Sequence, residues 1–231
     1  MKSWLVSRPW LKPVFRTVGE TRCKAWDLLH GVDTCGDVLL ADLDFQSENK
    51  APGLEYQSHH PRLLRTFLDE LAVDYEKYAF VDFGCGKGRM LLVASEFPFS
   101  RIVGVEFAAP LAEIAKRNLA TYRSKTQRCR DISVFAMDAV DYELPDQPEV
   151  LYFYSPFPPA VMEKVYQNIE RSLQKHPREI FVIFSGLPGA RERAFGCRSQ
   201  YERLQRKPHF DIYRRRPVLQ SEVDVGSVYQ H

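Results

Sequence analysis

Apolar positions along the chain form short continuous runs, separated by stretches in which they recur every three or four residues. Continuous runs are typical of buried strands, and the wider spacing is typical of helices that pack on a sheet. The runs that predict strands are Tyr78–Phe83, Arg101–Val105, Ile132–Ala136, Val150–Tyr154 and Ile180–Phe184. Helical spacing covers about residues 61–71, 87–96, 110–122 and 161–173. Strands that alternate with helices predict an α/β fold with a doubly wound, mostly parallel sheet and right-handed crossovers.

The N-terminal part has a weaker pattern. Residues 1–55 are irregular and predict a helical arm with two short helices, near Val14–Gly19 and Arg22–Leu29. The first nineteen residues carry four Lys or Arg and no acid, interleaved with aromatic residues. We favour the interpretation that this segment is a helical arm packed on the domain. The alternatives are contact with a membrane surface or a role as a transit peptide.

After the fifth predicted strand no clear helix is expected. Tyr201–Gln205 and His209–Tyr213, separated by Lys207-Pro208, predict an antiparallel hairpin at the end of the domain. The resulting division is an N-terminal arm over 1–55, one domain over 56–216 and a tail over 217–231.

Composition excludes several classes of protein. The 231 residues carry a net charge of only +2, so no overall field favours nucleic acid. No apolar run approaches the ~18–20 residues that span a bilayer, which predicts no transmembrane segment. The five cysteines are odd in number and contain no C-x-x-C pair. This spacing predicts neither a zinc site nor a disulfide framework, and a cytoplasmic location is expected.

A glycine-rich segment, Val81 to Arg89, ends the first predicted strand and begins the next helix. Glycines at alternate positions allow a sharp turn and let a ligand lie directly against the backbone. A dinucleotide fingerprint, G-x-G-x-x-G, would place its third glycine at position 89, but Arg89 stands there and Gly88 comes one residue earlier. The pattern therefore does not favour NAD.

Three features in order, D-x-G-x-G-x-G, then G-V-E at the end of the second strand, then an acid after the third strand, resemble the class I S-adenosylmethionine-dependent methyltransferases. These have a seven-stranded Rossmann-like sheet, and the match is to bacterial members of largely unassigned substrate. A tyrosine upstream of the first helix resembles, more distantly, the lid residue of the non-SET lysine methyltransferases. The cofactor-binding residues that the resemblance implies are Tyr56, Asp82, Gly84, Cys85, Gly86, Gly88, Glu106, Asp138 and Ala139.

The resemblance assigns Asp82 to the methionine end of S-adenosyl-L-methionine, Glu106 to the ribose diol and Asp138 to the adenine amino group. The simpler alternative is that Glu106 and Asp138 only cap the helices that follow them. Ligands in open α/β sheets bind at the carboxyl ends of the strands, where all three acids are predicted to lie.

Ser155-Pro156-Phe157 follows the fourth strand, at the place where amino-group methyltransferases carry Asp, Asn or Ser before prolines and an aromatic residue. The resemblance is partial and assigns these three residues to catalysis, because a stiff turn can orient a substrate amine. The alternative is a rigid loop that leads into a helix. Tyr152 and Tyr154 are further aromatic candidates for contact with a cationic group.

Three functions remain open. The leading hypothesis is N-methylation of a protein lysine or a small amine. Nucleic-acid methylation is a second, because Arg191 to Arg216 contains nine Arg or Lys against three acids. The third is a catalytically silent binding module. No metal is predicted, because His59-His60 has no further ligands at a suitable spacing.

Overall fold

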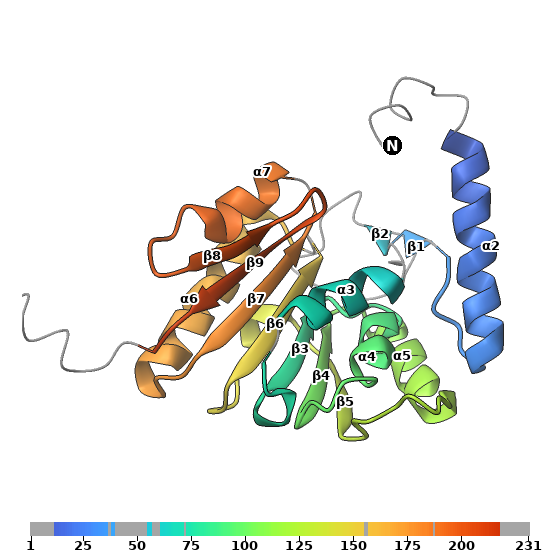
Figure 1. Ribbon diagram of the computed structural model, residues 1–231, viewed down its shortest axis with the longest axis horizontal. Helices are drawn as coiled ribbons and strands as arrows, with labels where there is room; N and C mark the ends of the chain where they lie inside the picture. Colours follow the sequence, from blue (N-terminus) through green and yellow to red (C-terminus); the bar gives the residue numbers. More distant parts are fainter. Residues whose placement is uncertain are drawn as a thin grey trace, which may run out of the picture.

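The computed structural model describes residues 12–36, 38–39, 55–56, 61–71, 73–154, 157–186 and 188–217, and only the backbone of 12–19, 39 and 55–56. The strands of the main sheet are β3 (Ala79–Phe83), β4 (Arg101–Glu106), β5 (Ile132–Ala136), β6 (Glu149–Tyr154), β7 (Ile180–Ser185), β8 (Glu202–Arg206) and β9 (Phe210–Arg215). Their order is β5-β4-β3-β6-β7-β9-β8 (Figure 1). The first five strands run parallel, and β9 is antiparallel to both β7 and β8. The predicted fold class is confirmed.

Strand β3 lies where the strand order reverses. It pairs with β4 on one side and with β6 on the other, so the connections from these strands leave in opposite directions. At such a reversal, open α/β sheets bind ligands in a crevice beyond the carboxyl ends of the strands, which here are those of β3 and its neighbours. The topology thus places the expected ligand site at the carboxyl ends of the strands.

Helices cover both faces of the sheet, which explains why its central strands are apolar throughout. These helices are α3 (Pro61–Leu71), α4 (Arg89–Ala94), α5 (Ala109–Thr121) and α6 (Pro159–Lys175). Figure 1 shows α3 and α4 in front of the sheet and α6 behind it. Successive residues of β3 alternate between two hydrophobic clusters, with Phe80 on the α3 side and Val81 on the α6 side. Each such side chain contributes ~1.5–3 kcal/mol through burial.

The N-terminal arm differs from the prediction in detail. One continuous helix, α2 (Lys12–His30), replaces the two predicted short helices. A glycine at position 19 costs a helix only ~1 kcal/mol, which is too little to end it. The end of α2 packs beside the end of α5, because the rings of Trp26 and His30 stack on that of Tyr122, the residue after α5, at centroid distances of 6.2 and 5.4 Å.

Residues that follow α2 connect the arm to the rest of the fold. A disulfide joins Cys23 in α2 to Cys35, with the two Cα atoms 5.7 Å apart. Spacing alone did not indicate this pair, because the turn at the end of α2 is what brings the two cysteines together. A short antiparallel pair follows, formed by β1 (Val38–Leu39) and β2 (Glu55–Tyr56).

The region after β7 also differs from the prediction. A helical turn, α7 (Pro188–Arg191), continues into a π-helical turn (Glu192–Gly196) where no clear helix was expected. The predicted hairpin is present as β8 and β9; β8 begins and ends one residue later than predicted, and β9 begins one residue later and ends two residues later. Within the described part of the chain, no helix is both long enough and apolar enough to cross a membrane.

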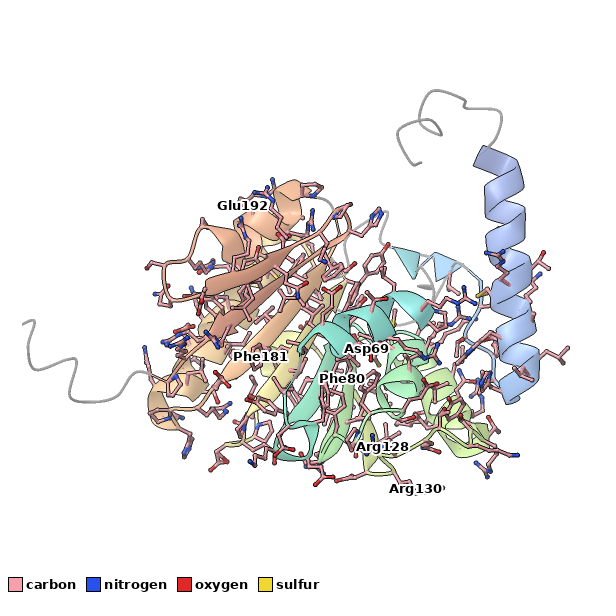
Figure 2. The ribbon with its side chains drawn as sticks, in the orientation of Figure 1. Asp69, Phe80, Arg128, Arg130, Phe181 and Glu192 are labelled. Atoms are coloured by element: carbon pink, nitrogen blue, oxygen red, sulfur yellow. A yellow bond between two sulfur atoms is a disulfide. The ribbon has the colours of Figure 1, made fainter. Side chains whose placement is uncertain are left out.

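The amino and carboxyl ends of the parallel strands can be distinguished in Figure 2. Phe80 and Phe181 lie within the core. Arg128 and Arg130 lie at the amino ends of the strands, just before β5, and Glu192 lies at the carboxyl ends, beyond β7. The expected ligand site at β3 lies on the same side as Glu192, because β3, β6 and β7 are parallel and their carboxyl ends point the same way.

Candidate functional site

The glycine loop turns sharply as it leaves β3. Gly84, Gly86 and Gly88 all have positive φ, at 81°, 53° and 83°. At Gly88 a side chain would also meet α5, because a Cβ atom there would lie 3.1 Å from the Cβ of Ala115. An L-residue in this left-handed conformation costs ~1–2 kcal/mol. The glycine pattern is therefore required by the backbone path as well as by a close approach to α5.

Backbone hydrogen bonds attach the loop to the end of β4. The N–H groups of Gly84 and Cys85 both donate to the carbonyl oxygen of Val105, at 2.8 and 3.1 Å. The Cys85 side chain points into the core and is 5% exposed. The role of Cys85 in cofactor binding stays a prediction.

Glu106 ends β4 and lies against the glycine loop. Its Oε2 accepts a hydrogen bond from the N–H of Gly86 at 2.8 Å, and its Oε1 accepts one from the N–H of Ala108 at 2.9 Å. Each carboxylate oxygen has two acceptor positions, so one remains on each oxygen. Burial raises the pKa of Glu106 to about 7, although the two backbone donors oppose that rise. The group offers two adjacent acceptors in a dry environment.

Asp82 lies on β3 beside Gly104 of β4 and Tyr152 of β6. It is 2% exposed. Among the described residues, none donates a hydrogen bond to its carboxylate. Burial, and secondly the charge of Glu106, raise the pKa of Asp82 well above its ordinary value. A buried carboxylate without a donor is costly, so this position favours a ligand that brings a cation or a hydrogen-bond donor.

Asp138 follows β5 at the same edge. Its Oδ1 accepts a hydrogen bond from the N–H of Val140 at 3.1 Å and so caps a short 3-10 helix (Ala139–Asp141). The N–H of Met137 donates to the carbonyl oxygen of Glu106 at 3.0 Å, which holds the ends of β4 and β5 together. The capping role weighed for Asp138 is thus present, and its role toward adenine stays a prediction.

The structure describes the other predicted residues only in part. Ser155 and Pro156 lie outside the described residues, and so does the side chain of Tyr56. Phe157 is half-buried and packs on the hydrophobic cluster of the α6 face. Tyr152 is buried in the core, where its ring lies 6.2 Å from that of Phe80. The proposed catalytic roles of Ser155, Pro156 and Phe157 therefore stay predictions.

The charged residues of the loop itself are not among the site residues predicted from sequence. Lys87 and Arg89 flank Gly88, and both side chains are buried. Their partners lie in residues 27–35, which no local pattern connects to the glycine loop.

The basic C-terminal region has less free charge than its sequence indicates. Seven of its nine cations form ion pairs with carboxylates of the described residues: Arg191, Arg198, Arg203, Lys207, Arg214, Arg215 and Arg216. Several of the partners are contributed by other elements, such as Glu163 and Glu170 of α6. A surface that is already neutralised has few cations left to release counterions from a phosphate backbone.

Comparison with known proteins gives likenesses of fold. No family model matches the chain, and no curated protein matches it. Among solved structures, a ribosomal protein L11 methylase from Lactobacillus delbrueckii subsp. bulgaricus is 16% identical with a TM-score of 0.48, over 75% of this chain and 91% of that one. The 23S rRNA methyltransferase ErmE is 13% identical with a TM-score of 0.48, over 70% and 71%.

A StiE O-MT structure, comprising residues 961–1257 of that protein, is 22% identical with a TM-score of 0.40. The match covers 54% of this chain and only 43% of the length of the StiE structure. Because the identities are below 25% and the TM-scores below 0.5, these likenesses do not assign an activity, a cofactor or a substrate to the chain.

Proposed function

We propose that the protein is an S-adenosylmethionine-dependent methyltransferase. The observation that carries this proposal is the pair of buried carboxylates at the switch point. Glu106 keeps two acceptor positions beside the glycine loop, and Asp82 is buried with no described donor. A ligand with a vicinal diol and a nearby cation complements both groups, and S-adenosylmethionine has a ribose diol, an ammonium and a sulfonium.

The residues of the chain would bind and orient the cofactor. Glu106 would accept two hydrogen bonds from the ribose, Asp82 would face the methionine end, and the backbone at Gly84 and Gly86 would allow close contact. When bound, S-adenosylmethionine supplies a methyl group activated by attachment to a positively charged sulfur. The protein then needs only to hold the acceptor in line with that methyl group, and positioning of this kind contributes up to ~7–11 kcal/mol.

We propose further that the acceptor is an amine, of a protein lysine or of a small molecule. This part rests on Ser155-Pro156-Phe157, which directly follows β6 at the edge of the sheet where β3 ends. A serine hydroxyl and a backbone carbonyl in a proline-stiffened turn can accept hydrogen bonds from a neutral amine and direct its lone pair. Nucleic-acid methylation is disfavoured by the ion-paired arginines of the C-terminal hairpin.

Calorimetric titration tests the cofactor. The full-length protein should bind S-adenosylmethionine and S-adenosylhomocysteine, but not NAD. Glu106→Gln should weaken binding ~10- to 100-fold, since a hydrogen bond to a charged group contributes ~1.5–3 kcal/mol. Glu149→Gln is the matched control, because Glu149 is also a buried carboxylate but lies at the amino end of β6, paired with Arg178. Failure of the folded protein to bind either ligand would refute the proposal.

Transfer of a labelled methyl group tests the reaction. Cell extract should be separated into protein, small amines and RNA before it is incubated with enzyme and methyl-labelled S-adenosylmethionine. We expect label in protein or in amines, and Ser155→Ala should lose transfer while it keeps cofactor affinity. Label in RNA alone would support the nucleic-acid alternative. Tight cofactor binding without transfer to any fraction would instead indicate the catalytically silent module.

A further inference from the structure

Two long cationic side chains of the glycine loop are buried. Arg89 is 3% exposed and Lys87 is 7% exposed, although both lie at the edge of the sheet where the chain turns away from β3. Buried cations require partners, because taking a charge out of water costs several kcal/mol. The partners of these two residues show what the loop is attached to.

Arg89 is held by the end of α2 and the turn after it. Its Nε donates to the Thr34 hydroxyl at 2.6 Å, and an Nη donates to Asp27 Oδ1 at 2.9 Å. The guanidinium also lies over the Trp26 ring, 5.3 Å from its centroid. A planar, multidentate group held in this way has little freedom.

Asp27 organises the turn that receives Arg89. Its carboxylate accepts hydrogen bonds from the Thr34 N–H at 2.7 Å, the Cys35 N–H at 2.6 Å and the Thr34 hydroxyl at 2.6 Å. Asp27 is itself buried, and Arg89 is the cation that pairs with it. The carboxylate therefore holds residues 34 and 35 and the loop arginine at the same time.

Lys87 makes a second attachment to the same turn. Its Nζ donates to the Cys35 carbonyl at 2.9 Å and to Asp33 Oδ1 at 3.2 Å. Asn118 of α5 adds a third, because its Nδ2 donates to the carbonyls of both Lys87 and Asp33, at 2.9 and 2.8 Å. Residues 27–35 thus hold the side chains on both sides of Gly88, and Asn118 joins their turn to the backbone of Lys87.

We infer that Asp27 is a positioning residue of the cofactor site and that residues 27–35 belong to that site. Asp27 acts through Arg89 on the loop, and the loop in turn places the Gly86 N–H that orients Glu106. This inference rests on the proposed function, because it concerns affinity for S-adenosylmethionine. A purely structural role for the arm would change stability but leave the affinity of the folded protein unaltered.

The test compares Asp27→Asn with Glu149→Gln in the full-length protein. Both changes remove one charge of a buried ion pair, but only the first pair contacts the glycine loop. We expect Asp27→Asn to raise the dissociation constant of S-adenosylhomocysteine about tenfold, within the range typical of coupling between sites. Glu149→Gln should lower the melting temperature and leave the dissociation constant within twofold of wild type. Equal affinity of Asp27→Asn and wild type would overturn the inference.

Hydrogen exchange in the ligand-free protein provides a readout that does not depend on the proposed function. Asp27→Asn should accelerate exchange of the backbone N–H groups of residues 84–89, whereas Glu149→Gln should not. Thr34→Val is a milder variant, in case Asp27→Asn does not fold, because it removes only the hydroxyl that accepts from Arg89. Unchanged exchange in the loop would overturn the inference even if the wild-type protein bound no cofactor.

Discussion

Ionisation of Glu106 should make the ligand-free protein less stable at neutral pH than in mild acid. The unfolded chain releases this proton near pH 4.5, whereas burial raises the pKa in the folded chain to about 7. Between these values the folded state binds more protons than the unfolded state, so stability decreases as pH rises. The stabilisation that comes from protonated Glu106 is fully present below about pH 4.5 and is lost above pH 7.

The difference between the two pKa values corresponds to about 3 kcal/mol, because one pKa unit is worth about 1.4 kcal/mol. Glu106→Gln removes the ionisation at nearly constant volume. The variant also places an amide N–H against one of the two backbone donors, Gly86 or Ala108, which adds a penalty that does not depend on pH. The informative quantity is therefore the change with pH in the difference between the two proteins.

Urea unfolding followed by circular dichroism, at intervals from pH 4.5 to 8, measures this quantity. The free energy of unfolding of wild type, minus that of Glu106→Gln, should fall by about 3 kcal/mol over that range. Glu149, whose pKa burial also raises to about 7, is present in both proteins and cancels. Asp82 is coupled to Glu106, so the two carboxyls titrate as a pair. A difference that stays constant from pH 4.5 to 8 would refute the reasoning.

Three further outcomes are expected. If Glu106 binds the ribose diol as proposed, the affinity of wild type for S-adenosylhomocysteine should rise about tenfold between pH 6 and 8 in calorimetry, because the ionised fraction of Glu106 rises about tenfold, and Glu106→Gln should lose this part of the pH dependence. Gly104→Ala should destabilise the protein by ~1–3 kcal/mol in urea unfolding, because the Cβ atom of the new alanine would lie 2.6 Å from Leu91 Cδ1. An unchanged unfolding midpoint would contradict this packing. Reduction of the Cys23–Cys35 disulfide should cost ~2–3 kcal/mol of stability, and Cys35→Ser should abolish the difference between reducing and non-reducing buffer.

The central strands could be predicted from sequence because both their faces are buried. A run such as Ile180–Phe184 has no polar position, and the observed strand β7 extends it by one residue. The π-helical turn at Glu192–Gly196 could not be predicted, because no local periodicity supports it. Its stability comes from distant contacts: Phe195 is fully buried against the sheet, and Arg191 pairs with Asp211 of β9. The π-helical turn therefore depends on tertiary contacts, which the local sequence pattern does not show.

The candidate site divides in the same way. The glycine loop and Glu106 are local features whose geometry follows from residue type, and sequence analysis found them. Asp27 and Thr34 are ordinary polar residues whose importance depends on Arg89, which lies 62 and 55 positions further along the chain. The C-terminal arginines suggested a basic patch because their partners in α6, such as Glu170, are not neighbours in sequence.

Residues 27–35 leave the ribosome well before the partners that hold them. Their hydrogen bonds with Lys87 and Asn118 join positions 52 to 85 residues apart. Contacts of such long sequence separation form late, because closing a long segment of chain costs entropy. A nascent chain arrested before Asn118 would contain β3, β4 and the glycines, yet the loop would lack one of its attachments. The loop can thus acquire all of these attachments during synthesis only after α5 has emerged.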